Sequence, residues 1–252
     1  MTMSSKLRHD NILNILEKQG YVTVRYLTET LHYSTATINR DLNALQKQQL
    51  VTRSHGGVEL VRSKHIPVFF RTHKMQSEKK YIGKTAASYV KDGDTIFIDG
   101  STTAQYMEQY LINRKNLTVV TNNIVLAATL SEYEIKAICL GGTIVEIPSM
   151  LLGPETIENA SKYRVDKMFF STTAASSAGI IASTQYTPMH KAIAENASEI
   201  FYLVDHEKID QPFNTIYCDF GKVDYVISDF SFDSKIKDKF SRTEFILVEK
   251  NR

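Results

Sequence analysis

Apolar side chains recur at helical spacing through the first fifty residues and predict three short helices. Their apolar positions are Ile12, Ile15 and Leu16 in the first helix, Leu27 and Leu31 in the second, and Ile38, Leu42 and Leu45 in the third. The first helix is expected to stop near Gly20, and the second at the break formed by His32 and Tyr33. Ser34 follows this break and is a good N-cap for the third helix. Two helices joined by so short a break are typical of a helix-turn-helix.

The third predicted helix has a polar face, and two short strands follow it. Residues 51–60 read as two strands around a Gly-Gly turn, which predicts a β-hairpin. A helix of this kind fits the DNA major groove, where Arg, Asn and Thr side chains reach base edges and phosphates. The hairpin would be a wing that follows the DNA backbone or minor groove. The candidate DNA contacts are Ser34, Thr35, Thr37, Asn39 and Arg40 on the helix, with Arg53 and His55 on the wing.

From residue 94 onward, short β-rich runs alternate with polar stretches long enough for helices. The runs cover residues 95–99, 117–121, 135–140, 167–170, 200–204, 225–228 and 245–248. This alternation predicts an α/β fold with a mainly parallel sheet. A polar, proline-containing segment that starts near Arg62 separates it from the first helices. We therefore predict a winged helix-turn-helix domain over residues 1–61, a linker over 62–76 and a second domain over 77–252.

Composition narrows the class of protein. The chain has 252 residues, of which 42% are apolar and 23% charged, with only 11 glycines and 5 prolines, so it suits two unequal folded domains and not a disordered chain. Its apolar runs are too short for a membrane span or a secretion signal, so we expect no membrane partner and a cytoplasmic location. Cys139 and Cys218 have no neighbours at ligand spacing, which predicts neither a disulfide framework nor a zinc site.

The net charge of +2 hides an uneven distribution. Residues 1–84 hold fourteen basic and six acidic side chains, a balance of +8, so the remainder carries −6. A small basic segment joined to a larger acidic one is typical of a nucleic-acid-binding module attached to a domain that avoids nucleic acid. A solvated basic face, or a three-helix module without a nucleic-acid role, would have the same pattern, and these alternatives stay open here.

Three of the predicted strands end in residues that suit a phosphate group. Ligands of open parallel sheets bind beyond the carboxyl ends of the strands. The first strand ends in Asp99-Gly100-Ser101-Thr102-Thr103 and enters a helix that contains Met107 and Leu111, which predicts a cradle of hydroxyl and amide groups. The next two strands end in Thr121-Asn122-Asn123 and Gly141-Gly142-Thr143. After a later strand, Lys208 offers a counter-charge for an anion, with a solvated surface lysine as the alternative.

Two stretches of the first domain carry a family resemblance. Residues 33–42 read Tyr-Ser-Thr-Ala-Thr-Ile-Asn-Arg-Asp-Leu, and residues 53–57 read Arg-Ser-His-Gly-Gly. With the rest of residues 8–58, they resemble the DeoR-type winged helix of bacterial repressors of sugar metabolism. The family usually has Val where this chain has Tyr33, and Arg where it has Asn39. Asn prefers adenine edges where Arg prefers guanine, so an altered operator sequence is expected.

The second domain carries the landmarks of the DeoR-family sensor domain in the same order. The resemblance implies that a helix over residues 77–90 opens the domain and that its fold is similar to that of ribose-5-phosphate isomerases. It also implies a phosphorylated sugar or a related metabolite as effector. The expected effector-binding residues are Asp99, Gly100, Ser101, Thr102, Thr103, Thr121, Asn122, Gly141, Gly142, Asp205 and Lys208.

The chain departs from this family near the expected sugar-binding end. Asp210 stands where the family tends to have glycine, residues 171–177 lack the usual glycine and polar or acidic residue, and residues 186–190 lack a frequent glutamate. Between Asp166 and Glu195 there is no Asp or Glu. An isomerase of this fold needs a carboxylate near the sugar carbons as general base, so we expect no catalytic residue. No metal site and no cofactor are expected either.

These observations together predict a transcriptional regulator, a repressor of carbohydrate-metabolism genes, that binds double-stranded operator DNA and responds to a phosphorylated sugar. The two-fold symmetry of helix-turn-helix sites and the family resemblance imply a homo-oligomer, either a dimer or a tetramer. Two alternatives stay open at this stage. One is a sugar-phosphate enzyme tethered to DNA, and the other is a constitutive DNA-binding protein with a degenerate sensor.

Overall fold

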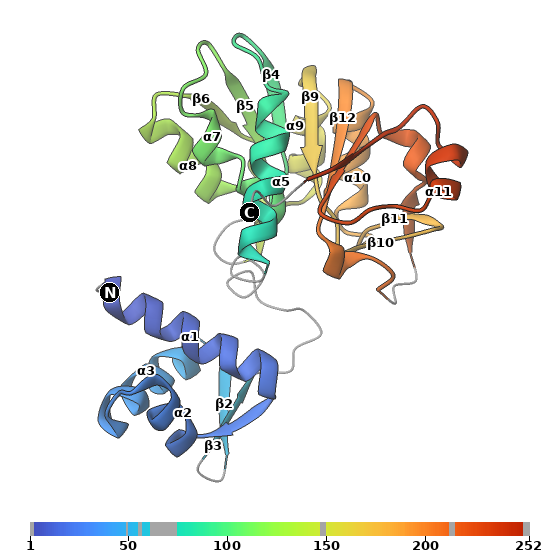
Figure 1. Cartoon of the computed structure of the whole chain (residues 1–252). Helices are drawn as coiled ribbons and strands as arrows, with labels where there is room; N and C mark the ends of the chain where they lie inside the picture. Colours follow the sequence, from blue (N-terminus) through green and yellow to red (C-terminus); the bar gives the residue numbers. More distant parts are fainter. Residues whose placement is uncertain are drawn as a thin grey trace. The chain divides into compact units, whose positions relative to one another are not determined.

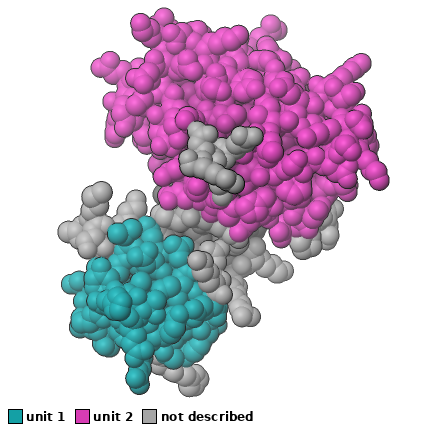
Figure 2. Space-filling model, viewed as in Figure 1, with its two compact units in different colours: residues 1–74 teal, residues 75–252 magenta. Residues whose placement is uncertain are grey.

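A computed structural model of the chain describes residues 3–48, 50–54, 57–60, 75–146, 150–211 and 215–248. The chain divides into two compact units, Met1–Lys74 (unit 1) and Met75–Arg252 (unit 2), which are coloured separately in Figure 2. The linker predicted over residues 62–76 falls almost wholly outside the described residues, as does His55. The predicted domain bounds therefore stay predictions.

The described residues of unit 1 form three helices and a small antiparallel sheet (Figure 1). Its elements are α1 (Met3–Gln19), β1 (Tyr21–Thr23), α2 (Val24–Leu31), α3 (Thr35–Lys47), β2 (Val51–Ser54) and β3 (Gly57–Leu60), with the strands in the order β1-β3-β2. The predicted apolar stripes meet in one core, where Leu16, Leu27 and Leu42 are fully buried. The predicted helix-turn-helix and hairpin are confirmed. The three residues of β1 are too few to show a period in the sequence, so this strand was not predicted.

Local geometry explains the break between α2 and α3. His32 ends α2 in the left-handed region, with φ of 56°. Ser34 then has extended backbone, and its Oγ accepts a hydrogen bond of 3.2 Å from the backbone N–H of Thr37. This bond satisfies a helix N–H that has no partner within α3, as expected for a serine N-cap. The break fixes the start of α3 and with it the residues that α3 presents to solvent.

A buried ion cluster ties α1 to α3. Arg8 donates to both carboxylate oxygens of Asp41, with 2.9 Å between Nη2 and Oδ1, and His9 Nε2 lies 3.1 Å from the same Oδ1. All three residues are at most 6% exposed. Burial raises the pKa of the Asp41 carboxyl, but the hydrogen bonds and charge of Arg8 outweigh it and leave this pKa below its usual value. The Arg8 guanidinium also lies 4.8 Å from the centre of the Tyr33 ring, so the cluster supports the break before α3.

Unit 2 is built around one parallel sheet of seven strands. The strands are β4 (Thr95–Ile98), β5 (Thr118–Thr121), β6 (Lys136–Cys139), β9 (Val165–Phe170), β12 (Ala197–Val204), β14 (Tyr225–Ser228) and β15 (Glu244–Leu247). They lie in the order β15-β14-β12-β9-β4-β5-β6, and every pairing between neighbours is parallel. All seven predicted strands and the predicted parallel α/β fold are thus confirmed.

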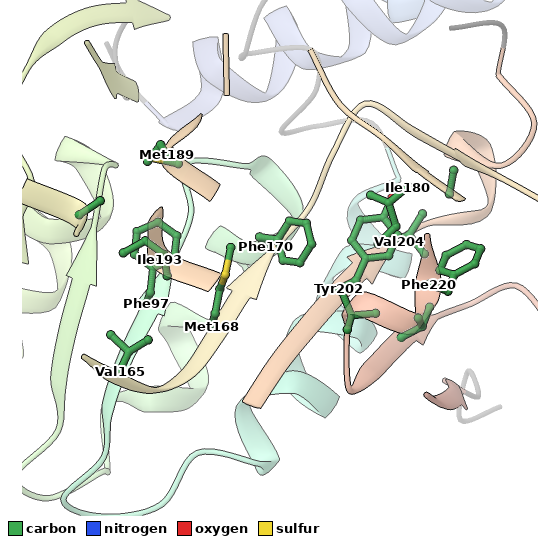
Figure 3. Close-up of a cluster of buried hydrophobic side chains, with 14 of the residues drawn as sticks. Phe97, Val165, Met168, Phe170, Ile180, Met189, Ile193, Tyr202, Val204 and Phe220 are labelled. Atoms are coloured by element: carbon green, nitrogen blue, oxygen red, sulfur yellow. The ribbon is translucent and has the colours of Figure 1, made fainter. Parts of the chain in front are cut away.

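Helices cover both faces of this sheet. On one face lie α5 (Gln76–Ser88), α6 (Thr102–Gln105), α7 (Glu108–Leu111) and α8 (Ile124–Glu132), and on the other lie α9 (Pro154–Ala160), α10 (Thr187–Ala194) and α11 (Ser234–Lys239). Phe97, Phe170, Met189 and Tyr202 belong to the core of the second face (Figure 3). Burial of these large side chains supplies most of the stability of such a domain.

The helix predicted through Met107 and Leu111 is two shorter helices, α6 and α7. The chain turns at Tyr106, whose backbone packs directly against Gly83 of α5. A Cβ atom at Gly83 would lie 2.7 Å from the Tyr106 carbonyl carbon, so the approach requires glycine. Tertiary packing therefore interrupts a helix that the local sequence favours.

Smaller elements extend the carboxyl ends of three strands of the sheet. The hairpin β7 (Thr143–Glu146) and β8 (Met150–Leu152) follows β6, the strands β10 (Ala174–Ser176) and β11 (Gly179–Ile181) follow β9, and the 3-10 turn η1 (His206–Lys208) and β13 (Ile216–Cys218) follow β12. A second 3-10 turn, η2 (Phe220–Lys222), precedes β14. These short elements were not predicted. No helix of the described residues is long and apolar enough to cross a membrane.

Candidate functional sites

The solvent-facing side of α3 adjoins strand β2 of the hairpin. Thr35 and Arg40 are exposed, whereas Thr37 and Asn39 are half-buried. Arg53 of β2 reaches across to α3, where its Nη2 donates to Asn39 Oδ1 at 2.6 Å and its Nη1 donates to Asn43 Oδ1 at 2.8 Å. The structure thus joins two predicted DNA contacts directly and adds Asn43, which the sequence analysis missed. Its spacing of four residues from Asn39 is the signal that places both on one face of the helix.

These contacts restrict what Asn39 can offer to a base. An asparagine reads adenine with its Oδ1 as acceptor and its Nδ2 as donor. In the structure Arg53 engages one lone pair of Oδ1, which leaves the second lone pair and Nδ2 as the groups that Asn39 can offer. Ser34 is similarly engaged, because its hydroxyl caps α3 and lies 2.9 Å from the Thr37 hydroxyl.

The order of the strands in unit 2 creates a switch point between β4 and β9. The chain runs from β4 outward through β5 and β6, and from β9 outward in the opposite direction through β12, β14 and β15. Connections that leave in opposite directions open a crevice at the carboxyl ends of the two central strands, where α/β proteins bind ligands. Asp99 follows β4 and Ser171 follows β9 at this point, and Asp99 N donates to Phe169 O at 3.0 Å.

Asp99 is the centre of the hydrogen bonds at this switch point. Its Oδ1 accepts from the backbone N–H of Ser101 at 3.1 Å and from the Ser101 hydroxyl at 2.5 Å. Its Oδ2 accepts from Ser171 N at 3.3 Å and lies 3.3 Å from His190 Nε2. Asp99 is 2% exposed. The carboxylate therefore positions the loop after β4, the end of β9 and helix α10 at once, a role for which its charge-assisted hydrogen bonds are well suited.

Two lysines approach the hydroxyl groups of α6 from different elements. Lys208 of η1 donates to Thr103 Oγ1 at 3.0 Å and to Ser171 Oγ at 2.8 Å. Lys79 of α5 is 3% exposed and donates to Thr102 Oγ1 at 3.2 Å. Two ammonium groups and adjacent hydroxyls are the donors that a phosphate group requires. The sequence analysis missed Lys79, which lies 23 residues before Thr102 in the chain.

Hydrogen bonds between His206 and Asp229 hold the turn that carries Lys208 in place. His206 Nδ1 lies 2.5 Å from Asp229 Oδ2, and its backbone N–H donates to Asp229 Oδ1 at 2.8 Å. The hydrogen bond to Asp229 raises the pKa of His206. Asp210, at the end of this segment, has φ of 55°, a left-handed conformation that glycine adopts most easily and aspartate tolerates. Its departure from the family pattern is therefore compatible with the fold.

Other predicted effector contacts hold the backbone around the site. Asn122 is fully buried, and its Oδ1 accepts from Gly100 N at 2.8 Å while its Nδ2 donates to Leu151 O at 2.9 Å. The Thr121 hydroxyl accepts from Asn123 N at 3.0 Å. These side chains position the loop after β4 and the hairpin after β6.

The glycines after β6 are explained by packing against α9. Gly142 has φ of 114°, and a Cβ atom there would lie 2.1 Å from Thr156 Oγ1. The same Thr156 hydroxyl donates to Gly141 O at 2.7 Å. Glycine is thus required for the close approach of this turn to α9, independently of any ligand.

Some buried polar atoms near the switch point have no hydrogen-bond partner among the described residues. They include Nδ2 of Asn123, Nδ1 of His190 and Oδ2 of Asp205. Proteins leave few such atoms unsatisfied, since each costs about 1–3 kcal/mol. His190 is a further residue that the sequence analysis missed, because 91 residues separate it from Asp99. Within the described part of the chain, no three His, Cys, Asp or Glu residues gather as metal ligands would.

Both units match known families. Residues 8–64 match the DeoR-like helix-turn-helix domain, and residues 74–230 match the DeoR C terminal sensor domain. The chain is 33% identical to the glycerol-3-phosphate regulon repressor of Escherichia coli (strain K12) over 210 residues, which cover 82% of this chain and 83% of that protein. It is 33% identical to the HTH-type transcriptional repressor GlcR of Bacillus subtilis (strain 168) over 222 residues, or 86% of each chain.

Two further similarities complete the comparison. The lactose phosphotransferase system repressor of Staphylococcus aureus (strain N315) is 28% identical over 242 residues, which cover 93% of this chain and 96% of that protein. Among solved structures, ribose 5-phosphate isomerase A from Methanocaldococcus jannaschii has a TM-score of 0.40 and 21% identity over 54% of this chain and 55% of that chain.

Proposed function

The chain belongs to the DeoR family of transcriptional regulators, and from this premise we propose that it is a DNA-binding repressor whose operator affinity falls when a phosphorylated sugar or polyol binds unit 2. The relatives named above are repressors, two of them named after a phosphorylated compound or a phosphotransferase system. The names of those relatives favour genes of carbohydrate metabolism as targets.

The observation that carries the effector half of this proposal is the pair of lysines at the switch point. Lys79 and Lys208 come from distant segments, and both donate to hydroxyl groups of α6. A phosphate group placed among these donors would give each ammonium group an ionised acceptor in place of a neutral hydroxyl, which strengthens the hydrogen bond. This arrangement supports a functioning anion site and disfavours a degenerate sensor.

The geometry at Asp99 favours a regulator over an enzyme. A general base must accept a proton from the substrate carbon, and the two oxygens of Asp99 already accept from Ser101 and Ser171 and face His190. A carboxylate so engaged is better suited to hold a binding site than to move protons.

Linkage between the two units would convert effector binding into a change in DNA affinity. A ligand that prefers one arrangement of the protein shifts the population toward it, and a tenfold change in DNA affinity requires only about 1.4 kcal/mol of coupling. We propose a homo-oligomer on palindromic or repeated half-sites, in keeping with the two-fold symmetry of helix-turn-helix operators.

DNA recognition by α3 is tested by replacing Arg40 with alanine. An operator duplex is first selected from a random library with the full-length protein, and gel-shift titrations then follow at one fixed salt concentration. Arg40→Ala removes a side chain that α3 exposes to solvent and that would reach into the major groove, so the affinity for the selected duplex should fall about tenfold or more. Affinity for an unrelated duplex should fall less.

An exposed arginine of unit 2 gives the matched control. Arg242→Ala makes the same change of size and charge outside α3, and it should leave the operator affinity unchanged. If Arg40→Ala binds the selected duplex as tightly as the unchanged protein does, α3 is not the recognition helix.

A further inference from the structure

His190 presents a buried hydrogen-bond acceptor at the switch point. Its Nε2 lies 3.3 Å from Asp99 Oδ2, and a carboxylate oxygen can only accept, so Nε2 carries the hydrogen. In the neutral form of the ring, the other nitrogen, Nδ1, has a lone pair. This atom is buried without a partner in the described structure, in a residue that is 3% exposed. A ligand group that meets Nδ1 must therefore donate a hydrogen bond.

Asp205 presents a second buried acceptor at the end of β12. Its Oδ2 is buried without a hydrogen bond among the described residues, and Lys208 Nζ lies 3.7 Å from it. This distance is too long for a hydrogen bond but close enough to place Asp205 beside the anion site. A ligand group that contacts Asp205 Oδ2 directly must donate a hydrogen bond, as a hydroxyl group does, because a carboxylate oxygen only accepts.

A series of contacts connects both acceptors to the same site. His190 reaches Lys208 through Asp99 and Ser171, in steps of 3.3, 3.3 and 2.8 Å, and Lys208 lies beside Asp205. The rings of Phe170 and Tyr217 flank His190, with centroid distances of 5.2 and 5.9 Å. The site thus holds donors around the two lysines, an acceptor of Asp205 beside Lys208, and an acceptor of His190 beside aromatic rings.

We infer that His190 and Asp205 are specificity-determining residues that read the hydroxyl groups of the effector and reject a second anionic group in contact with them. This inference rests on the proposed function, because it assumes that a phosphate binds the donors around the two lysines. The ligand class is then a monophosphate of a neutral polyol or sugar. Phosphorylated acids are excluded, since a carboxylate has no hydrogen to donate to either acceptor.

Matched ligand pairs test this specificity directly. Glycerol 3-phosphate has a hydroxymethyl group where 3-phosphoglycerate has a carboxylate. In the same way, glucose 6-phosphate has a neutral sugar end where 6-phosphogluconate has an acid. Binding to the full-length protein is measured by calorimetry, with inorganic phosphate as the probe of the anion site alone. In at least one pair the neutral member should bind about tenfold or more tightly than the acid, because a site built to bind hydroxyls leaves its acceptors unpaired with the analogue.

Substitutions of the two acceptors separate their roles. His190→Phe removes Nδ1 and should lower the affinity for the neutral ligand about tenfold. Its affinity for inorganic phosphate should stay within about twofold of that of the unchanged protein. His190→Gln keeps an acceptor and a donor and should restore part of the loss. Asp205→Asn removes the charge and should reduce the discrimination against the acid. Circular dichroism of each variant verifies that it is folded. If His190→Phe does not fold, His190→Gln is used for the test in its place.

The outcomes distinguish this inference from the function on which it rests. If the acid of each pair binds as tightly as its neutral partner, or if His190→Phe and His190→Gln both keep the full preference, the assignment of His190 and Asp205 is wrong while the anion site stands. If neither inorganic phosphate nor any phosphorylated compound binds the unchanged protein, the proposed effector site itself is wrong, and the inference fails with it.

Discussion

Replacement of Lys208 by methionine is expected to abolish the response to a phosphorylated effector. Methionine keeps an unbranched side chain but removes the ammonium group that contacts Thr103 and Ser171. Hydrogen bonds to charged groups contribute about 1.5–3 kcal/mol, so the effector Kd should rise roughly 10- to 150-fold. Calorimetry gives the Kd, and a gel shift with and without effector gives the response on operator DNA.

A lysine of α11 supplies the control for this substitution. Lys235 is exposed, so Lys235→Met loses the same charge outside the switch point and should leave both the Kd and the operator response unchanged. The operator affinity of Lys208→Met without effector should equal that of the unchanged protein. An effector Kd that does not change in Lys208→Met would remove Lys208 from the site and, with it, the anion site around Thr103.

Replacement of Asp41 by alanine should unfold unit 1 while unit 2 keeps its fold. Arg8 would be left with a buried charge and no carboxylate, a change that costs about 3–5 kcal/mol. The expected result is loss of operator binding at temperatures where the effector still binds. Hydrogen exchange followed by mass spectrometry measures the effect for each unit, and faster exchange should be confined to peptides of unit 1.

Two further variants identify the cause of the destabilisation. Asp238→Ala removes an exposed carboxylate from α11 and should leave exchange in unit 1 unchanged. The double variant Arg8→Met/Asp41→Leu replaces the ion pair by apolar side chains and should be more stable than Asp41→Ala, because no guanidinium is then left unpaired. Equal exchange rates in Asp41→Ala and the unchanged protein would show that the buried cluster does not stabilise unit 1.

Several features of the fold are determined locally and were therefore predicted from the sequence. The seven strands of the parallel sheet have apolar runs of their own, and Ser34 caps α3 through a bond that spans three residues. Four of the five short strands described at the carboxyl edge, β8, β10, β11 and β13, have only three residues, too few to show a pattern. The break between α6 and α7 was missed because it depends on contact with Gly83, 23 residues earlier than Tyr106.

The candidate site stays a prediction, and the structure adds contacts that the sequence analysis did not foresee. The residues that follow β4 can be found from the sequence, because a strand that ends in glycine, hydroxyl groups and a helix start has a recognisable pattern. The sequence does not reveal that Asp99 is fully engaged by Ser101, Ser171 and His190. It also does not distinguish Gly142, where packing against α9 requires glycine, from residues that face a ligand.

The sequence by itself determined the two-domain organisation, the helix-turn-helix, the parallel sheet and the family, because apolar periods, caps and motifs act over a few residues. Only the tertiary structure decided which side chains meet. Lys208 contacts Thr103 across 105 residues, and His190 contacts Asp99 across 91. Such pairs form because the strand order brings the carboxyl ends of β4, β9 and β12 to one edge, and no local pattern along the chain records that order.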